Sequence, residues 1–176
     1  MRPPCVVRWP DRISVGSEYA GITSVMDILP TFAALAGVDL PTDRVIDGYD
    51  ISGMLCGEVN AASPYDTVGF FYYQMSQLQA VRSGRYKLYL PLSEKIIGIE
   101  RERTVRCVAE LYDLYGDVGE TENIAASQPE IVARLTMMAE SARAELGDTD
   151  LEGSGQRLAG WCDDPQPCRQ NEQGQR

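Results

Sequence analysis

The segment ELYDLYGDVGETENIA, residues 110–125, combines five acidic residues with two glycines and an asparagine. Oxygen-rich loops can bind calcium, but an EF-hand loop requires a glycine at its sixth position and a glutamate at its twelfth. If the loop began at Asp113, the sixth position would be Val118, so the spacing does not fit. We therefore predict a structural joint, in which the glycines form turns and Asn123 bonds to nearby backbone.

The segment FFYYQMSQLQ, residues 70–79, is the most pocket-like part of the sequence. Alternation along a strand would place two of its four aromatic residues in the core. Tyr73, Gln74 and Gln77 would then lie near the end of the strand, where α/β sheets bind their ligands. We predict these three residues to bind substrate, and plain surface is the alternative.

Two further groups of charged residues have simpler interpretations. Arg82, Arg85 and Lys87 flank a predicted turn and could hold an anionic group, although a solvated turn also explains them. Asp47 and Asp50 are better interpreted as turn and cap residues than as a catalytic pair of carboxylates.

The sequence contains no histidine, so any catalysis would depend on carboxylate, Lys, Tyr, Cys or Ser side chains. Its five cysteines have no zinc-site spacing. Cys5 is flanked by apolar residues, which is typical of an inert core thiol. Cys162 and Cys168 are close enough in sequence to pair, which is left open.

The net charge of −10 argues against nucleic acids and anionic membrane surfaces as partners. No run of about 18 apolar residues occurs, so we predict no membrane span.

Several elements are expected in the first part of the chain. CVVRW, residues 5–9, is apolar and β-branched, which predicts a buried central strand. A helix is expected over residues 27–36, capped by Asp27 and ended by Gly37. Its apolar face would comprise Ile28, Leu29, Phe32, Leu35 and Ala36. A short helix should follow, capped by Asp50 and ended by Gly57.

The second part resembles a small antiparallel sheet with a helix packed on it. Strands are expected at residues 67–73 and 110–114, and a hairpin over residues 78–90. The last helix should begin with a capping box formed by Ser127 and Glu130 and should end at Gly147. Its apolar stripe would comprise Ile131, Leu135, Met138, Ala142 and Leu146.

Five motifs in this order resemble the sulfatases of arylsulfatase type, in the alkaline-phosphatase superfamily. They are Arg8-Trp9-Pro10, DILPT at 27–31, AGVDLP at 36–41, the Asp47-Gly48 segment through Gly57, and the hairpin followed by LYDLYGDVGETEN. Val118 stands where the family usually has proline. The resemblance extends from about Arg2 to Gly147 and implies the C-terminal part of this α/β fold.

The resemblance also implies chemistry that this sequence lacks. Sulfatases use a formylglycine made in a C-x-P-x-R motif and a calcium ion, and neither this motif nor an Asp-Asn pair for the metal is present. We therefore expect no catalytic or metal-binding residue in this chain; calcium and formylglycine would belong to a preceding N-terminal part. A sulfate ester would bind only when that part is present, and analogy implies a periplasmic or secreted parent enzyme.

We accordingly expect three regions: residues 1–69 from the sulfatase α/β domain, residues 70–147 as a small α+β subdomain, and a loosely ordered tail at 148–176. The predicted function is a C-terminal sulfatase fragment that is inactive alone. A non-catalytic binding or interaction module built on the same fold is the alternative. A related phosphatase or phosphodiesterase is a third hypothesis, but those enzymes bind two metals through Asp and His.

Overall fold

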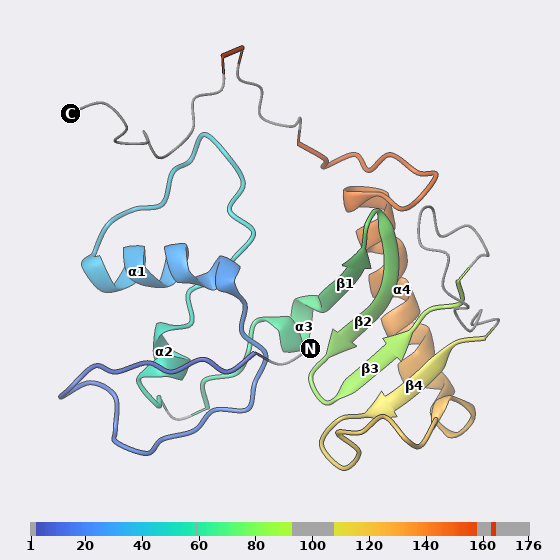
Figure 1. Cartoon of the computed structure of the whole chain (residues 1–176), viewed down its shortest axis with the longest axis horizontal. Helices are drawn as coiled ribbons and strands as arrows, with labels where there is room; N and C mark the ends of the chain where they lie inside the picture. The colour runs from blue at the N-terminus through green and yellow to red at the C-terminus, as the bar shows by residue number, and fades with distance from the viewer. Residues whose placement is uncertain (1–2, 59, 93–107, 158–162, 165–176) are drawn as a thin grey trace, which may run out of the picture.

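The computed structural model describes residues 3–58, 60–92, 108–157 and 163–164 (Figure 1). Up to Val68 the described chain forms helices, and from Phe70 onward it forms a sheet and a long helix; we call these two parts the N-terminal and C-terminal halves. In chain order the elements are η1 (Val25–Asp27), α1 (Ile28–Ala36), α2 (Ser52–Leu55), α3 (Tyr65–Val68), β1 (Phe70–Gln74), β2 (Gln77–Ser83), β3 (Tyr86–Tyr89), β4 (Glu110–Asp113), η2 (Ala125–Ser127) and α4 (Pro129–Leu146).

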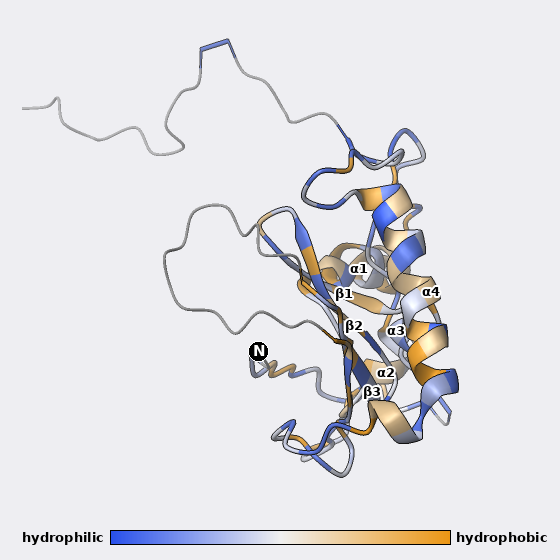
Figure 2. Cartoon of the chain, turned by 90° about the vertical axis from the view of Figure 1, so that its right-hand side faces the viewer, coloured by the Kyte–Doolittle hydropathy of each residue, from blue (hydrophilic) through white to orange (hydrophobic). Residues whose placement is uncertain are grey.

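The four strands form one antiparallel sheet in the order β1-β2-β3-β4, and α4 covers one of its faces (Figures 1 and 2). The predicted hairpin is confirmed as β2 and β3, which turn at Gly84 with a positive φ of 57°. Such a backbone conformation favours glycine because glycine has no Cβ. This arrangement confirms the predicted small antiparallel sheet with a C-terminal helix packed on it.

The core of this half lies between the sheet and α4. Its buried residues are Leu78, Val81, Leu88, Leu90 and Leu111 from the sheet side, and Leu135, Ala139 and Ala142 from α4. Phe71 and Tyr73 pack against this core, which confirms that two of the four aromatic residues of the segment face inward.

A bulge in β2 changes which of its side chains share a face. Tyr72 pairs with Ala80 and Tyr73 pairs with Leu78, so Gln79 has no partner across the β1–β2 ladder. The extra residue lets both Leu78 and Val81 face α4.

The start of α4 differs from the predicted capping box. Ser127 lies in η2, where its hydroxyl donates to the carbonyl oxygen of Ile124 at 3.0 Å. The helix starts at Pro129, and the capping position, Gln128, makes no side-chain bond to it. Pro129 explains this start, since a proline in the first turn loses no helical hydrogen bond.

The strand predicted at residues 67–73 begins later than expected. Thr67 and Val68 belong to α3, and β1 begins at Phe70 after Gly69. The Ser63 hydroxyl accepts a hydrogen bond from the Tyr65 amide at 3.2 Å, which favours this helical turn.

Residues 5–9 do not form the predicted strand. They contain no strand in the described structure, and Val6 is 93% exposed. The prediction of a buried Cys5 is also wrong, because its thiol is exposed and free. A strand requires a hydrogen-bonding neighbour, and no described strand lies beside this segment.

Helix α1 has nearly the predicted bounds, and Gly37 ends it in the left-handed conformation. Its predicted apolar face does not pack: Phe32 is 63% exposed, and Ile28, Leu29 and Leu35 are exposed as well. The buried residues of α1 are instead Pro30 and Thr31. The predicted cap is also different, because Asp27 makes no side-chain bond to α1 and instead completes a capping box with Ser24 around η1.

Asp27 and Thr31 join α1 to the segment that follows it. The fully buried Asp27 carboxylate accepts hydrogen bonds from the Ser24 amide (2.7 Å), the Tyr49 amide (2.9 Å) and the Tyr65 hydroxyl (2.6 Å). Gly48 approaches this site so closely that a Cβ there would overlap the carbonyl oxygen of Met26. This contact explains the glycine of the Asp47-Gly48 motif.

Candidate functional site

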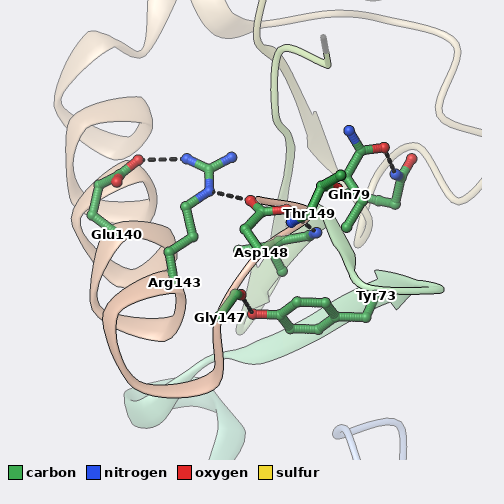
Figure 3. A network of polar contacts seen from close by, with 9 residues as sticks. Tyr73, Gln79, Glu140, Arg143, Gly147, Asp148 and Thr149 are labelled. Atoms are coloured by element: carbon green, nitrogen blue, oxygen red, sulfur yellow. Dashed lines mark hydrogen bonds and ion pairs between the residues drawn. The ribbon is translucent and has the colours of Figure 1, made fainter. Parts of the chain in front are cut away.

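The predicted substrate-binding residues lie where the β1–β2 turn meets the end of α4. The Tyr73 hydroxyl donates to the carbonyl oxygen of Gly147 at 2.9 Å, which fixes this ring against α4 (Figure 3). Gln74 and Gln77 pair across the end of the hairpin. Of the three predicted residues, Gln77 lines an open pocket of about 360 Å³, whereas Tyr73 and Gln74 do not.

Strand β2, the residues beyond β3, helix α4 and the loop after α4 form the wall of this pocket. The lining residues are Gln77 and Leu78 of β2, Pro91 and Leu92 beyond β3, Arg143 of α4, and Asp148, Thr149, Asp150 and Leu151. We call this the Gln77 pocket. Its volume is in the range of small-molecule sites.

Asp148 holds the wall of the Gln77 pocket together (Figure 3). One carboxylate oxygen accepts from the Leu78 amide at 3.2 Å and from the Thr149 amide at 2.8 Å. The other accepts from Arg143 Nε at 2.6 Å. This carboxylate therefore fixes the loop after α4 to the start of β2.

Arg143 is bound by two acids. Its Nε donates to Asp148 and its Nη1 donates to Glu140 at 2.5 Å. Burial alone would lower the pKa of the guanidinium, but the two carboxylates outweigh it and raise the pKa above its usual value. Arg143 therefore stays charged inside the pocket wall.

Tyr73 is held in its neutral form at the same place. Burial is the main cause that raises its pKa, and the charge of Asp148 raises it further. Neutral Tyr73 can donate its hydroxyl proton to Gly147, so it positions the wall of the pocket.

The cationic residues near the hairpin turn do not converge on an anion site. Arg82 Nε donates to the carbonyl oxygen of Gly84, and Arg85 forms a two-point ion pair with Asp113. Lys87 donates to Glu120 at 2.7 Å. Each cation therefore has an intramolecular partner. The alternative of a solvated turn is also wrong for two of the three residues, because Arg82 and Lys87 are buried.

The acidic segment at 110–125 uses its polar side chains to hold its own backbone. Asp117 accepts from the Thr121 amide at 2.7 Å and the Glu122 amide at 2.8 Å. Asn123 accepts from the Leu111 amide at 3.1 Å and thereby ties the segment to β4. These contacts confirm the predicted structural joint.

The other predicted turn and cap residues also have structural partners. Asp50 accepts from the Ser52 amide at 2.8 Å at the start of α2. Asp47 pairs with Arg157 at 2.5 Å. Within the ranges that the structure describes, no group of three metal-ligating side chains gathers, and no helix is long and apolar enough to cross a membrane. Cys162 and Cys168 lie outside the described residues.

Sequence reasoning missed Arg143 and Asp148 as parts of the site. Arg143 lies on the polar side of an amphipathic helix, and Asp148 follows the glycine that ends this helix. Nothing in their spacing connects them to Gln77, which is 66 residues before Arg143 in the sequence. Only the packing of α4 on the sheet brings Arg143 and Asp148 close to Gln77.

Comparisons with known proteins agree with this architecture. The profile of the family described as N-sulphoglucosamine sulphohydrolase, C-terminal, matches residues 1–145. The chain is 46% identical over 82 residues to the steryl-sulfatase of Mus musculus, covering 47% of this chain and 13% of that protein. It is 30% identical over 154 residues to human arylsulfatase A, covering 78% of this chain and 30% of the relative.

Solved structures show the same fold. A Bacteroides thetaiotaomicron structure from work on glycosaminoglycan metabolism matches with a TM-score of 0.53 and 26% identity, over 66% of this chain and 24% of the other. A second, described as a complex with its substrate D-glucosamine-2-N,6-O-disulfate, matches with a TM-score of 0.52 and 25% identity, over 77% of this chain and 27% of the other.

The matched part is a minor share of each of these relatives, between 13% and 30% of its length. The family match, by contrast, covers most of the present chain. The neighbours in structure are sulfatases with the alkaline-phosphatase-like fold. The chain therefore belongs to the family of sulfatase C-terminal regions described as N-sulphoglucosamine sulphohydrolase, C-terminal.

Proposed function

We propose that this chain is the C-terminal part of a sulfuric ester hydrolase and that it does not hydrolyse sulfate esters alone. The observation that carries the proposal is the family match over residues 1–145, combined with the small share of each relative that the chain covers. The chain would complete the fold of the enzyme and contribute to its substrate pocket.

The exposed apolar surface of the N-terminal half supports this role. Val6 and the outer face of α1 leave large hydrophobic side chains in water, with Val6 at 93% and Phe32 at 63% exposure. An exposed apolar face of a helix, such as that of α1, usually marks a contact with another part of a protein. We propose that the preceding part of the sulfatase covers this surface.

The catalytic groups would lie in that preceding part. The sequence has no histidine and no C-x-P-x-R motif. In the part of the chain that the structure describes, no group of three acidic or other metal-ligating side chains could hold a calcium ion, and the Asp27, Asp113 and Asp117 carboxylates bind intramolecular donors. In this proposal calcium and formylglycine act only in the complete enzyme.

The β1–β2 end of the sheet is the part of this chain that we propose to meet substrate. Tyr73, Gln74 and Gln77 lie together there, and Gln77 opens into the pocket beside Arg143. Tyr73 acts as a positioning residue, since its hydroxyl is bound to Gly147.

A chimaera tests this function. In human arylsulfatase A, the region that aligns with this chain would be replaced by residues 1–157, and hydrolysis of 4-nitrophenyl sulfate would be followed with added calcium. We expect calcium-dependent turnover by the chimaera and none by residues 1–176 alone. A folded chimaera without turnover would contradict the proposal.

The isolated chain supplies the matched control. Turnover above a blank by residues 1–176, abolished by a chelator, would show that the chain is an enzyme by itself. Cooperative unfolding of the isolated chain does not separate the sulfatase part from a free-standing interaction module, since the sheet and α4 enclose a core of their own.

A further inference from the structure

The segment that follows α4, residues 147–157, folds back over the end of this helix. The last four carbonyl groups of an α-helix have no partner within the helix. Three of those in α4 accept hydrogen bonds from the returning segment. These bonds run from the amide of Ser154 to Ala144 (3.0 Å), from the amide of Gly155 to Glu145 (2.8 Å) and from the side-chain amide of Gln156 to Leu146 (2.6 Å). The segment therefore caps the C-terminal end of α4.

Close backbone contacts fix the path of this segment. Gly147 and Gly153 are both buried. A Cβ at Gly153 would lie 2.3 Å from the carbonyl oxygen of Glu145, and a Cβ at Gly147 would lie 2.6 Å from that of Leu151. Cβ atoms do not approach carbonyl oxygens this closely, so a side chain at either position would push the segment away from α4.

Arg157 extends from this cap to the N-terminal half. Its Nη1 donates to the carbonyl oxygen of Val45 at 2.8 Å, and its Nη2 donates to the Asp47 carboxylate at 2.5 Å. These acceptors precede Arg157 by 112 and 110 residues. Figure 1 shows the segment after α4 running toward the loop between α1 and α2, which contains both acceptors. The planar guanidinium therefore holds two points of this loop at once.

The loop that Arg157 holds is also bound to the start of α1. The Tyr49 amide donates to the Asp27 carboxylate at 2.9 Å, and the Ile51 amide donates to the Thr31 hydroxyl at 3.1 Å. Asp27 and Thr31 are both buried. A contact that restrains the loop therefore also restrains α1.

The two halves meet directly at Gly69, between α3 and β1. Beside this junction the Ser83 hydroxyl donates to the carbonyl oxygen of Asp66 at 2.6 Å. These contacts lie near one point, about which two rigid bodies can still rotate. Figure 1 shows the end of α4 at the opposite end of β1 from this junction. An attachment there, at Arg157, opposes such a rotation.

We infer that residues 147–157 form a conformational strap, which caps α4 at one end and holds the loop between α1 and α2 at the other. The strap restrains the N-terminal half against rotation about the junction at Gly69. It follows the part of the chain that matches the family, residues 1–145. It acts in the isolated chain and does not depend on the proposed sulfatase function.

Amide hydrogen exchange on residues 1–176 tests the strap. Arg157→Ala removes both donors and should speed exchange of the Tyr49 amide about two- to fivefold, the range that corresponds to an exposed ion pair. Exchange of the Leu135 amide should stay unchanged, because this residue lies in the core between the sheet and α4. An unchanged rate at Tyr49 would overturn the inference.

Arg44→Ala is the matched control. Arg44 lies in the same loop, but it pairs with the adjacent Asp43 and does not reach the other half. Its loss should leave the exchange of the Tyr49 amide unchanged. Equal acceleration by Arg44→Ala and Arg157→Ala would show that the loss of any positive charge here loosens the loop, which would also overturn the strap.

The orientation of the two halves gives a second test. In weakly aligned samples, the residual dipolar couplings of α1 and α4 should fit one alignment tensor for the parent chain and for Arg44→Ala. The same couplings should require two tensors for Arg157→Ala. One tensor for all three proteins would show that the junction at Gly69 alone fixes the halves, which would contradict the restraint by the strap.

Discussion

Asp27 is the residue on which the N-terminal half of the chain depends most. Its carboxylate is fully buried and accepts three hydrogen bonds, from two backbone amides and the Tyr65 hydroxyl. Burial raises the pKa of Tyr65 above its usual range, and the bond to Asp27 raises it further. Tyr65 therefore remains a proton donor to this carboxylate at all ordinary pH values.

Replacing Asp27 with asparagine should destabilise this half. Asparagine keeps one acceptor oxygen, but an NH2 group replaces the other oxygen. This donor would face a backbone N–H, which is also a donor, and neither group would find an acceptor. We expect the free energy of unfolding to fall by about 1–3 kcal/mol, the cost of an unsatisfied buried polar group. Urea denaturation followed by tyrosine fluorescence measures this change.

Asp39→Asn provides the matched control, since Asp39 is an exposed aspartate just beyond α1. It should change the free energy of unfolding by less than about 0.5 kcal/mol. Equal stability of the Asp27 and Asp39 variants would show that the buried hydrogen bonds carry no net stabilisation.

Individual residues were predictable where local spacing alone decides their role. Asn123 accepts from the Ala125 amide and Asp50 accepts from the Ser52 amide, so each acts on backbone two residues away, and turn chemistry identifies both. Asp27 was expected as a cap for α1, but its partners Tyr49 and Tyr65 lie 22 and 38 residues away. Arg143 and Asp148 were not predicted as site residues for the same reason: the packing of α4, and not their spacing in the sequence, places them beside Gln77.

At the scale of elements, α1 and α4 show opposite outcomes of the same apolar pattern. Helix α4 packs most of its predicted stripe on the sheet, with Leu135 and Ala142 buried, but the last member, Leu146, is 41% exposed. Helix α1 has a comparable apolar face that remains exposed. Periodicity therefore predicted both helices. The order of the elements also indicated the sheet that covers α4, but nothing in the sequence indicated a covering surface for α1.

Leu135→Ala should strongly destabilise the sheet and α4. It leaves a cavity at the centre of the core formed with Leu88 and Leu111. Large-to-small changes of this kind cost about 2–5 kcal/mol. Thermal unfolding of the variant, followed by circular dichroism, should show a clearly lowered midpoint.

Met137→Ala is the control on the same helix, because Met137 is 67% exposed. Its midpoint should stay close to that of the parent chain. A small effect of Leu135→Ala, similar to that of Met137→Ala, would show that α4 contributes little to the core.

The strands illustrate the limit of prediction for elements. The hairpin and β4 pair with one another in one antiparallel ladder and were predicted correctly. Residues 5–9 have an equally clear β composition but no described partner strand. Strand propensity describes how side chains fit a sheet, and a strand forms only where a neighbour pairs with its backbone.

For the whole molecule, the two halves differ in how completely they bury their apolar side chains. The C-terminal half encloses a core, whereas the N-terminal half exposes the outer face of α1 together with Val6 and Val7. Arg157 links the halves through bonds to Asp47 and to the carbonyl oxygen of Val45 at 2.8 Å.

Substitutions on the outer face of α1 should weaken the assembly with the catalytic part of the enzyme while leaving the stability of the isolated chain nearly unchanged. Leu29→Gln with Phe32→Gln replaces two exposed side chains and should change the free energy of unfolding of the isolated chain by less than about 1 kcal/mol. In the arylsulfatase A chimaera the same change should abolish turnover, because the face would then be buried against the catalytic part.

Val15→Gln is a suitable control, because Val15 is also an exposed apolar side chain outside α1. Its chimaera should retain turnover. Full activity of the Leu29 and Phe32 chimaera would show that α1 faces water in the complete enzyme.

The bulge at Gln79 has a consequence for how such a protein can diversify. Because the extra residue restores Leu78 to the core side, the unpaired Gln79 can be exchanged while the hydrophobic layer keeps its alignment. Loss or gain of one residue in β2 would instead rotate every later side chain to the opposite surface. Natural variation can therefore substitute Gln79, whereas an insertion or deletion in β2 would disrupt the core.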